Sequence, residues 1–261
     1  MLKENENWLN VLHWLADEAS YISLKYFRQH LDIESKANQT PVTIADKEIE
    51  LILRSLIMMK FPEHQIIGEE FENQEAIDDR YCWVIDPIDG TVAFSCGKPT
   101  FTTLIALLED GKPIASIIDQ PFLGERYCGL HDFSSLKNDS VIATNQIITE
   151  IADARLNATT PYMFKTIDEQ TKFEKLHKQV KLTSFGGDAY SFGLLASGNI
   201  DIIMEADLAY YDVAALVPII TGAGGIITDW QGKQICREFN GQCLASANTK
   251  LHTKILELIN N

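Results

Sequence analysis

The sequence has no long apolar run. No window approaches the ~20 consecutive apolar residues that a helix needs to cross a bilayer. The first ten residues, MLKENENWLN, also lack the apolar core and small-residue cleavage site of a signal peptide. We therefore expect a protein without a membrane partner, located in the cytoplasm.

Cysteine and histidine are too scattered to indicate a zinc site. The five cysteines are odd in number and never form a CxxC pair, so we expect free thiols and no disulfide framework. The six histidines are dispersed, and none pairs with an acid at metal-ligand spacing. Zinc is therefore not the expected metal.

The chain has few positively charged residues. The chain has 22 Lys and Arg residues against 37 Asp and Glu residues, a net charge of -15. Nucleic acids are bound through Lys and Arg patches, so we expect no nucleic-acid partner. An acidic protein can still bind a small phosphorylated molecule if metal cations lie between its carboxylates and the phosphate.

The apolar pattern of the first half predicts helices packed on an antiparallel sheet. The chain has 261 residues, 46 % of them hydrophobic, enough for one large domain or two closely packed smaller ones. Helical spacing predicts helices over 8–27 and 44–60, the second with Thr43 and Asp46 as a capping box. The expected strands are 64–70, a buried strand from Tyr81, a hairpin over 100–121 around an Asp110-Gly111 turn, and 125–130.

Beyond Asp132 the pattern changes to alternating strands and helices. We expect strands at 141–144, 161–164, 179–183, 200–205, 225–230 and 243–246. The expected helices lie near 146–156, near 168–178, over 212–224 and from Thr249 onward. Residues 133–140 are the best boundary between two halves, 1–133 and 140–261. Together the halves predict a layered fold of the α+β or α/β class.

Acidic residues gather at the ends of these expected elements. The run WVIDPIDGT finishes a buried strand with two aspartates, and GEE finishes the strand before it. Each acid has an ordinary alternative, because Asp-Pro and Asp-Gly form turns, acidic runs are often solvated, and Asp often caps helices. As a set at element ends, however, they indicate convergence on one site. The acids are Asp46, Glu69, Glu70, Asp86, Asp89 and Asp212.

Convergent carboxylates without His or Cys partners favour a hard cation such as Mg²⁺. Two or three Mg²⁺ ions could neutralise a phosphate, lower the pKa of a bound water and stabilise a leaving oxygen. Gly90 and Thr91 follow the aspartate pair and offer unobstructed backbone N–H groups and a hydroxyl for a phosphate oxygen. The pattern therefore predicts a metal site that works on a phosphate ester.

Four motifs in order resemble the signature of the inositol monophosphatase family of Mg²⁺-dependent, lithium-sensitive phosphomonoesterases. They are VTIAD (42–46), GEE (68–70), DPIDGT (86–91) and YDVAA (211–215) with GAGG (222–225). The resemblance spans about residues 8 to 250. It implies a layered αβαβα sandwich of the inositol monophosphatase and fructose-1,6-bisphosphatase type, and self-association as a homodimer.

The resemblance also implies roles for individual residues. One metal would be held by Glu69, Asp86 and the Ile88 carbonyl, and a second by Asp86, Asp89 and Asp212. Most of these ligands lie in 1–133, and the last lies in 140–261 with the substrate pocket. Glu69 and Thr91 would position the attacking water, Asp46 would support Thr91 and help bind a weaker third metal, and the Gly90 and Thr91 N–H groups would hold the phosphate. Attack by water would be in line, without a covalent enzyme intermediate.

Departures from the family pattern bear on the substrate. The chain has GTVAF where the family commonly has GTTNF, and Tyr211 where Trp is usual. The segments IDQP, FGGDAYSFGLLASG and YDVAALVPIITGAGG are more similar to the histidinol-phosphatase branch than to the inositol-phosphatase branch. We therefore expect L-histidinol phosphate as substrate, with an inositol phosphate or broad specificity as the alternative.

Two carboxylates of the second half fit a cationic substrate. Asp188 follows Gly187 and precedes Ala189 in the substrate-binding segment of the family, and Glu205 aligns with a position that contacts substrate hydroxyls. Carboxylates suit the ammonium and imidazole of histidinol better than an uncharged polyol. Asp188 could instead be only a helix cap.

Two rival functions follow from other features. Phosphatases of the haloacid dehalogenase type use the first aspartate of DxDGT as a nucleophile, but here two residues separate the aspartates, and we find no convincing later Lys and Gly-Asp motif. A regulatory scaffold could keep the fold and lose a metal ligand, but every matched ligand position is intact.

Overall fold

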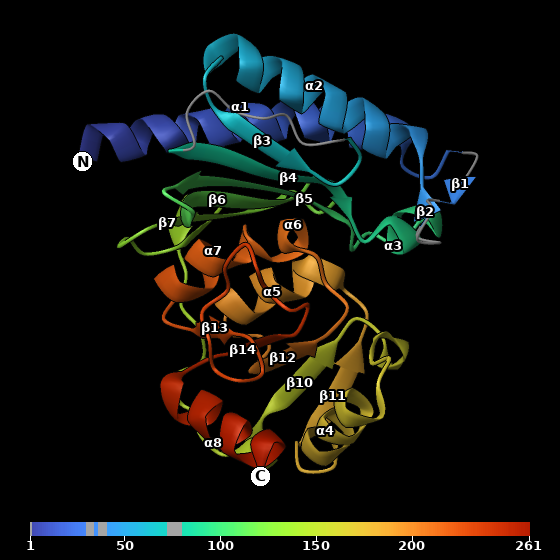
Figure 1. The fold of residues 1–261 in the computed structure, drawn as a ribbon, viewed down its shortest axis with the longest axis vertical. Coiled ribbons are helices and arrows are strands. Elements are labelled where there is room, and N and C mark those ends of the chain that lie inside the picture. Colours follow the sequence, from blue (N-terminus) through green and yellow to red (C-terminus); the bar gives the residue numbers. More distant parts are fainter. Residues whose placement is uncertain (1, 30–33, 36–40, 72–79) are drawn as a thin grey trace.

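The computed structural model has five layers, as Figure 1 shows: two helices, a sheet, a central layer of helices, a second sheet, and two outer helices. It describes the whole chain except residues 1, 30–33, 36–40 and 72–79. The predicted αβαβα sandwich is confirmed.

The first two layers are formed by residues up to 141. Helices α1 (Leu2–Tyr26) and α2 (Ile44–Lys60) cover one face of a seven-stranded sheet in the order β3-β4-β5-β6-β7-β8-β9. A small separate sheet pairs β1 (Glu34–Ser35) with β2 (Pro41–Val42). The strands of the large sheet are β3 (Gln65–Gly68), β4 (Tyr81–Asp89), β5 (Thr102–Glu109), β6 (Lys112–Gln120), β7 (Glu125–Leu130), β8 (Leu136–Lys137) and β9 (Ser140–Val141).

Helix and hairpin predictions for this half are confirmed by specific local features. Thr43 and Asp46 form the capping box of α2. The turn between β5 and β6 has positive φ at Asp110 and Gly111, which twists the chain to match the paired strands. One prediction was wrong in part, since β3 pairs with β4 in parallel and the sheet is therefore not wholly antiparallel.

The second half supplies the central helices and the outer layers. Its sheet has the order β11-β10-β12-β14-β13. Its strands are β10 (Arg155–Ala158), β11 (Leu182–Phe185), β12 (Ile202–Glu205), β13 (Ile226–Thr228) and β14 (Cys243–Ser246). Its helices are α4 (Ile167–His177), α5 (Asp188–Ala196), α6 (Tyr210–Val213), α7 (Leu216–Gly222) and α8 (Thr249–Asn260); the short α3 (Thr91–Ser95) follows β4.

Three hydrophobic cores hold the layers together. The first lies between α1, α2 and the large sheet, around Trp83. The second lies between the two sheets and encloses the central helices, around Phe192 and Ile219. The third lies between the smaller sheet and α4 and α8, around Trp230. The central core contains residues from both halves of the chain, so the halves pack as one continuous structure.

Three sequence-based assignments in 141–164 were wrong. The expected helix near 146–156 is a 3-10 turn (Ile151–Asp153) followed by β10, and the expected strand at 161–164 is a second 3-10 turn (Pro161–Met163) capped by Thr160. The expected strand at 141–144 is only the end of β9, in the first sheet. Strand β10 lies between two other strands, and the apolar run of a strand buried on both faces cannot be told from a helix by periodicity.

The expected helix over 212–224 is split into α6 and α7. Pro218 has no N–H to donate to the carbonyl of Ala214, so the helical hydrogen-bond ladder is interrupted between them. All five cysteines are free, as predicted. Among the described residues, no helix combines the length and the apolar character that crossing a bilayer requires.

Candidate metal centre and active site

Asp86 and Asp89 lie on one side of β4 because a β-bulge separates them. In the ladder with β5, Asp86 pairs with Leu104 and Asp89 pairs with Thr102, so three steps along β4 match two along β5. The extra residue reverses the alternation of side chains. Ile88 therefore packs into the core beneath α1 and α2, while Asp89 joins Asp86 on the side that faces the central layer.

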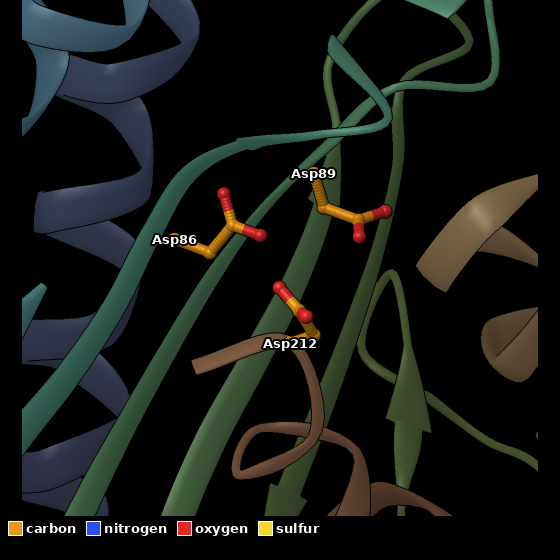
Figure 2. Close-up of side chains that lie close together, drawn as sticks. All are labelled: Asp86, Asp89 and Asp212. Atoms are coloured by element: carbon orange, nitrogen blue, oxygen red, sulfur yellow. The ribbon is translucent and has the colours of Figure 1, made fainter. Parts of the chain in front are cut away.

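Asp212 approaches this pair from the central layer. It lies in the first turn of α6, where its Oδ2 accepts the backbone N–H of Ala209 at 2.7 Å. One carboxylate oxygen from each of Asp86, Asp89 and Asp212 lies within 4.8 Å of the other two. Figure 2 shows the three side chains close together, with Asp86 and Asp89 on the sheet side and Asp212 on the side of the central layer.

The cluster concentrates negative charge away from water. Burial raises the pKa of Asp86 well above its ordinary value, and the nearby charges of Glu69, Asp89 and Asp212 raise it further. Burial likewise raises the pKa of Asp89 well above its ordinary range, reinforced by Asp188 and Asp212. Carboxyl groups in this arrangement bind protons readily, unless a bound metal cation neutralises their charge instead.

The donor set fits a hard divalent cation. Asp86 Oδ1 is buried, and within the described part of the chain no group donates a hydrogen bond to it. An unpaired buried carboxylate oxygen is costly, and a metal ion removes that cost by coordination. Because the three convergent side chains offer only carboxylate oxygens, they match the preference of Mg²⁺.

Glu69 reaches the same cluster from the neighbouring strand. Strands β3 and β4 are parallel, and Gly68 pairs with Ile85, so Glu69 follows the end of β3 at the level of Asp86 on β4. After burial, the nearby charge of Glu69 is the largest cause of the raised pKa of Asp86. The sequence prediction that Glu69 shares a site with the aspartate pair therefore agrees with the geometry.

Thr91 and Asp46 lie beside the cluster and contact each other. The Thr91 hydroxyl lies 3.0 Å from the Ile88 carbonyl and 3.4 Å from Asp46 Oδ1. Asp46 is fixed through Oδ2, which accepts the N–H of Thr43 at 2.8 Å and its hydroxyl at 2.5 Å. Burial raises the pKa of Asp46 and the Thr43 hydrogen bonds oppose that rise.

Gly90 allows the chain to turn from β4 into α3. Its φ of +79° is strained for any residue with a side chain, and an added Cβ would lie 3.0 Å from Asp188 Oδ2. The first N–H groups of α3, beginning at Thr91, have no acceptor within the helix and are available to an anion.

Helix α5 brings three predicted substrate residues to the other side of Asp89. The backbone N–H of Ala189 donates to Asp89 Oδ2 at 2.7 Å, so Ala189 holds a proposed metal ligand and, unlike Asp188, does not line the cavity. Gly187 sets the start of α5 with a φ of +106° and also lies outside the cavity lining. Burial raises the pKa of Asp188 to about 6, and Lys98 opposes the rise.

Glu205 ends strand β12 in the cavity wall. Its Oε1 accepts both the N–H and the hydroxyl of Thr159, at 2.9 and 2.7 Å. Burial raises the pKa of Glu205 to about 7, against the effect of the Thr159 hydrogen bonds and with a smaller contribution from Asp188. Thr159 was not found from the sequence, because it follows β10, a strand that was not predicted and whose start overlaps the helix expected near 146–156.

These residues surround one cavity of about 670 Å³. Its wall combines the acidic groups with apolar side chains and the backbone of a loop before β14. The lining residues include Glu69, Asp89, Gly90, Thr91, Asp188, Glu205, Asp207, Asp212, and on the apolar side Met163, Leu208, Tyr211 and Phe239. Tyr211, noted in the sequence as a departure from Trp, has its pKa raised by burial and then by Glu69 and Asp212.

A carboxylate cluster of this chemistry, set at the edge of a cavity in an αβαβα sandwich, is suited to hold metal ions against a phosphate ester. The chain belongs to the inositol monophosphatase family, whose sequence model matches residues 4–261. It is thus a phosphoric monoester hydrolase that acts on small phosphate esters.

Individual relatives agree with the family assignment over nearly the whole chain. The chloroplastic bifunctional phosphatase IMPL2 of Arabidopsis thaliana is 41 % identical over 253 residues, which cover 93 % of this chain and 72 % of the relative. A histidinol-phosphatase of Chlorobaculum parvum is 32 % identical and covers 95 % and 94 %. The solved structure of an inositol monophosphatase from Zymomonas mobilis has a TM-score of 0.89 and 39 % identity, with 98 % of each chain covered.

Proposed function

We propose that this phosphatase is Mg²⁺-dependent and hydrolyses L-histidinol phosphate to L-histidinol and phosphate. The observation that carries the proposal is the charge of the cavity. Six carboxylate side chains line it, and no Lys or Arg is among the lining residues in the described part of the chain. A phosphate ester can enter such a cavity only with cations, from bound metal and from the substrate itself.

The metal ligands we propose are Glu69, Asp86, Asp89, Asp212 and the Ile88 carbonyl, for two ions, with a third near Asp46. When bound, Mg²⁺ supplies positive charge for the phosphate and lowers the pKa of water. The unpaired Oδ1 of Asp86 and the convergence of three aspartates within 4.8 Å support this assignment.

Thr91 and Glu69 are proposed to orient the attacking water. Thr91 has one hydroxyl proton, which it can donate to the Ile88 carbonyl at 3.0 Å or to Asp46 Oδ1 at 3.4 Å, and its lone pairs can accept a hydrogen bond from water. Asp46, fixed by Thr43, keeps the Thr91 hydroxyl beside the cavity. The N–H groups of Gly90 and Thr91 would bind phosphate oxygens at the start of α3.

Asp188 and Glu205 are proposed to select a cationic alcohol. Both line the cavity, together with the more exposed Asp207, and none of the three belongs to the proposed metal ligands. Because Oε1 of Glu205 already accepts two hydrogen bonds from Thr159, Oε2 can accept from a substrate ammonium or imidazolium. Met163 and Phe239 provide apolar surface for an imidazole ring.

An inositol phosphate is the second candidate substrate. It is favoured by the 39 % identity to a solved inositol monophosphatase over the full chain. The extra acidic side chains of the cavity could then accept hydrogen bonds from ring hydroxyls.

Phosphate release from L-histidinol phosphate and from myo-inositol 1-phosphate, measured side by side, tests the proposal. We expect strong preference for L-histidinol phosphate with Mg²⁺ and loss of turnover with a chelator. Preference for the inositol ester would refute the cationic-substrate assignment and retain the metal centre. Equal turnover with chelator and with Mg²⁺ would refute the metal centre.

A further inference from the structure

A buried carboxylate on α2 holds the turn that carries Glu69. Glu50 is fully buried, although it lies on a helix whose neighbouring acid, Glu48, is partly exposed. Its side chain points beneath the end of β3. Fully buried glutamates are rare unless a partner compensates their charge, so the position calls for an explanation.

The contacts of Glu50 are concentrated on the backbone just after Glu69. Oε2 accepts the N–H of Glu70 at 2.7 Å, and Oε1 accepts the N–H of Phe71 at 3.3 Å. Arg54, one helical turn later, donates its Nε to Glu50 Oε1 at 2.8 Å and its Nη2 to the Phe71 carbonyl at 3.1 Å. The ion pair therefore binds the backbone at two N–H groups, of Glu70 and Phe71, and at one carbonyl, of Phe71.

Gly68 is required for this contact. An added Cβ at Gly68 would lie 2.0 Å from Glu50 Oε1 and 2.8 Å from Arg54 Nη2, closer than any side chain permits. Its backbone has no need of positive φ, so the close approach of the ion pair is the reason for glycine here. The GEE motif thus combines Glu69, a proposed metal ligand, with Gly68, whose lack of a side chain leaves room for Glu50 and Arg54.

A glutamine could not replace Glu50 in these contacts. The carboxylate accepts three hydrogen bonds with its two oxygens, whereas a glutamine amide would turn one NH₂ group toward a donor. The position therefore requires a charged acceptor, not merely a polar side chain.

We propose that Glu50, with Arg54, is a positioning residue for the metal centre: it fixes the backbone after Glu69 so that the Glu69 carboxylate is held beside Asp86. The inference rests on the proposed role of Glu69 as a metal ligand. Groups that orient metal ligands from outside the coordination sphere typically change metal affinity by about 10- to 100-fold when removed.

The test is the Mg²⁺ concentration that gives half-maximal thermal stabilisation of the protein, measured without substrate. A second readout is the Mg²⁺ midpoint for hydrolysis of p-nitrophenyl phosphate. We expect Glu50→Gln to raise both midpoints about 10- to 100-fold, with turnover largely recovered at saturating Mg²⁺. Gly68→Ala should give the same shift, because its Cβ displaces Glu50 while leaving every charge in place.

Asp201→Asn is the matched control. Asp201 is also a fully buried carboxylate that binds a backbone N–H and an arginine, since it accepts the N–H and the Nε of Arg155 at 2.9 and 2.8 Å. It directly precedes β12, at the opposite end of that strand from Glu205. This variant should lose thermal stability without a change in the Mg²⁺ midpoints.

The outcomes separate this inference from the proposed function. If Glu50→Gln and Gly68→Ala shift the Mg²⁺ midpoints no more than Asp201→Asn does, Glu50 is merely structural and the inference fails while the metal centre stands. If the wild-type protein shows no Mg²⁺ response, the proposed metal centre fails, and this inference fails with it.

Discussion

Removing one charge from the aspartate cluster should stabilise the metal-free protein and abolish its activity. In Asp86→Asn, an amide replaces a carboxylate that is buried beside Asp89 and Asp212, with oxygens within 4.8 Å. The amide removes like-charge repulsion and can donate a hydrogen bond to a neighbouring carboxylate.

The size of the gain follows from the geometry. Two unit charges about 5 Å apart repel by about 3 kcal/mol at an effective dielectric constant of about 20. Proton uptake by the cluster, whose pKa values are raised, relieves part of this repulsion in the wild type. We therefore expect Asp86→Asn to increase the free energy of unfolding by about 1 to 2 kcal/mol in the presence of a chelator.

Added Mg²⁺ should reverse the order of stability. A ligand at about 100 times its Kd stabilises the native state by about 2.7 kcal/mol. The wild type should show a gain of this order, whereas Asp86→Asn should show little, because it lacks a ligand shared by both proposed metal sites. Phosphatase activity of the variant should fall by at least about 100-fold.

Urea unfolding in EDTA and in Mg²⁺, together with phosphate release, measures these effects. Asp110→Asn is the control, because it makes the same substitution in the exposed turn between β5 and β6, at a positive φ that asparagine tolerates. A variant at position 86 that is less stable than the wild type in EDTA and equally stabilised by Mg²⁺ would show that Asp86 is structural and would refute the metal assignment.

Three further predictions concern the pocket, the phosphate site and the outer core. Glu205→Gln should raise the KM for L-histidinol phosphate about tenfold or more and change turnover of p-nitrophenyl phosphate little; equal losses on both would mean that Glu205 supports the fold and does not recognise substrate. Gly90→Ala should reduce kcat by at least about tenfold and destabilise the protein by about 1 to 2 kcal/mol, because φ is +79°; calorimetry and initial rates measure both, and a wild-type rate would contradict the proposed phosphate contact. Burial lowers the pKa of His252 from 6.5 to about 4, so the unfolded chain binds a proton between these values that the native protein does not, and stability falls as the pH drops from 6.5 toward 4. Between pH 7 and pH 5 the wild type should therefore lose about 2 kcal/mol more than His252→Gln in urea unfolding, and parallel losses in the two proteins would contradict this account.

The local elements of the first half could be predicted because each carries its own signal. Helix α2 has a capping box and a single apolar face, and β5 and β6 meet at an Asp-Gly turn. The segment 146–164 failed because β10 is buried on both faces and has no alternation to distinguish it from a helix. The parallel pairing of β3 and β4 was missed, because the sequence patterns of two strands do not show whether they pair in parallel or antiparallel.

Some residues of the candidate site could be predicted from the sequence and others could not. Asp86, Asp89, Glu69 and Asp212 were predicted from motifs at element ends, and the fold brings them together. Thr159 and Glu50 were not predicted, because a threonine after a strand and a glutamate within a helix carry no local sign of what they contact. The hydrogen bond from the Ala189 N–H to Asp89 was not predicted either.

The sequence by itself determined the chemistry of this protein: an acidic chain with few cations, carboxylates at the ends of its elements, and the ordered motifs of a phosphatase family. Those features are local, because residue type and short spacing decide which ligands and turns are available. Tertiary structure alone decided how they act together. A bulge in β4 turned Asp89 to the side of Asp86, the packing of the central layer brought Asp212 across to them, and α2 placed Glu50 under the turn of Glu69. These contacts join residues far apart in the chain, and they form only when burial of three apolar cores fixes the layers relative to one another.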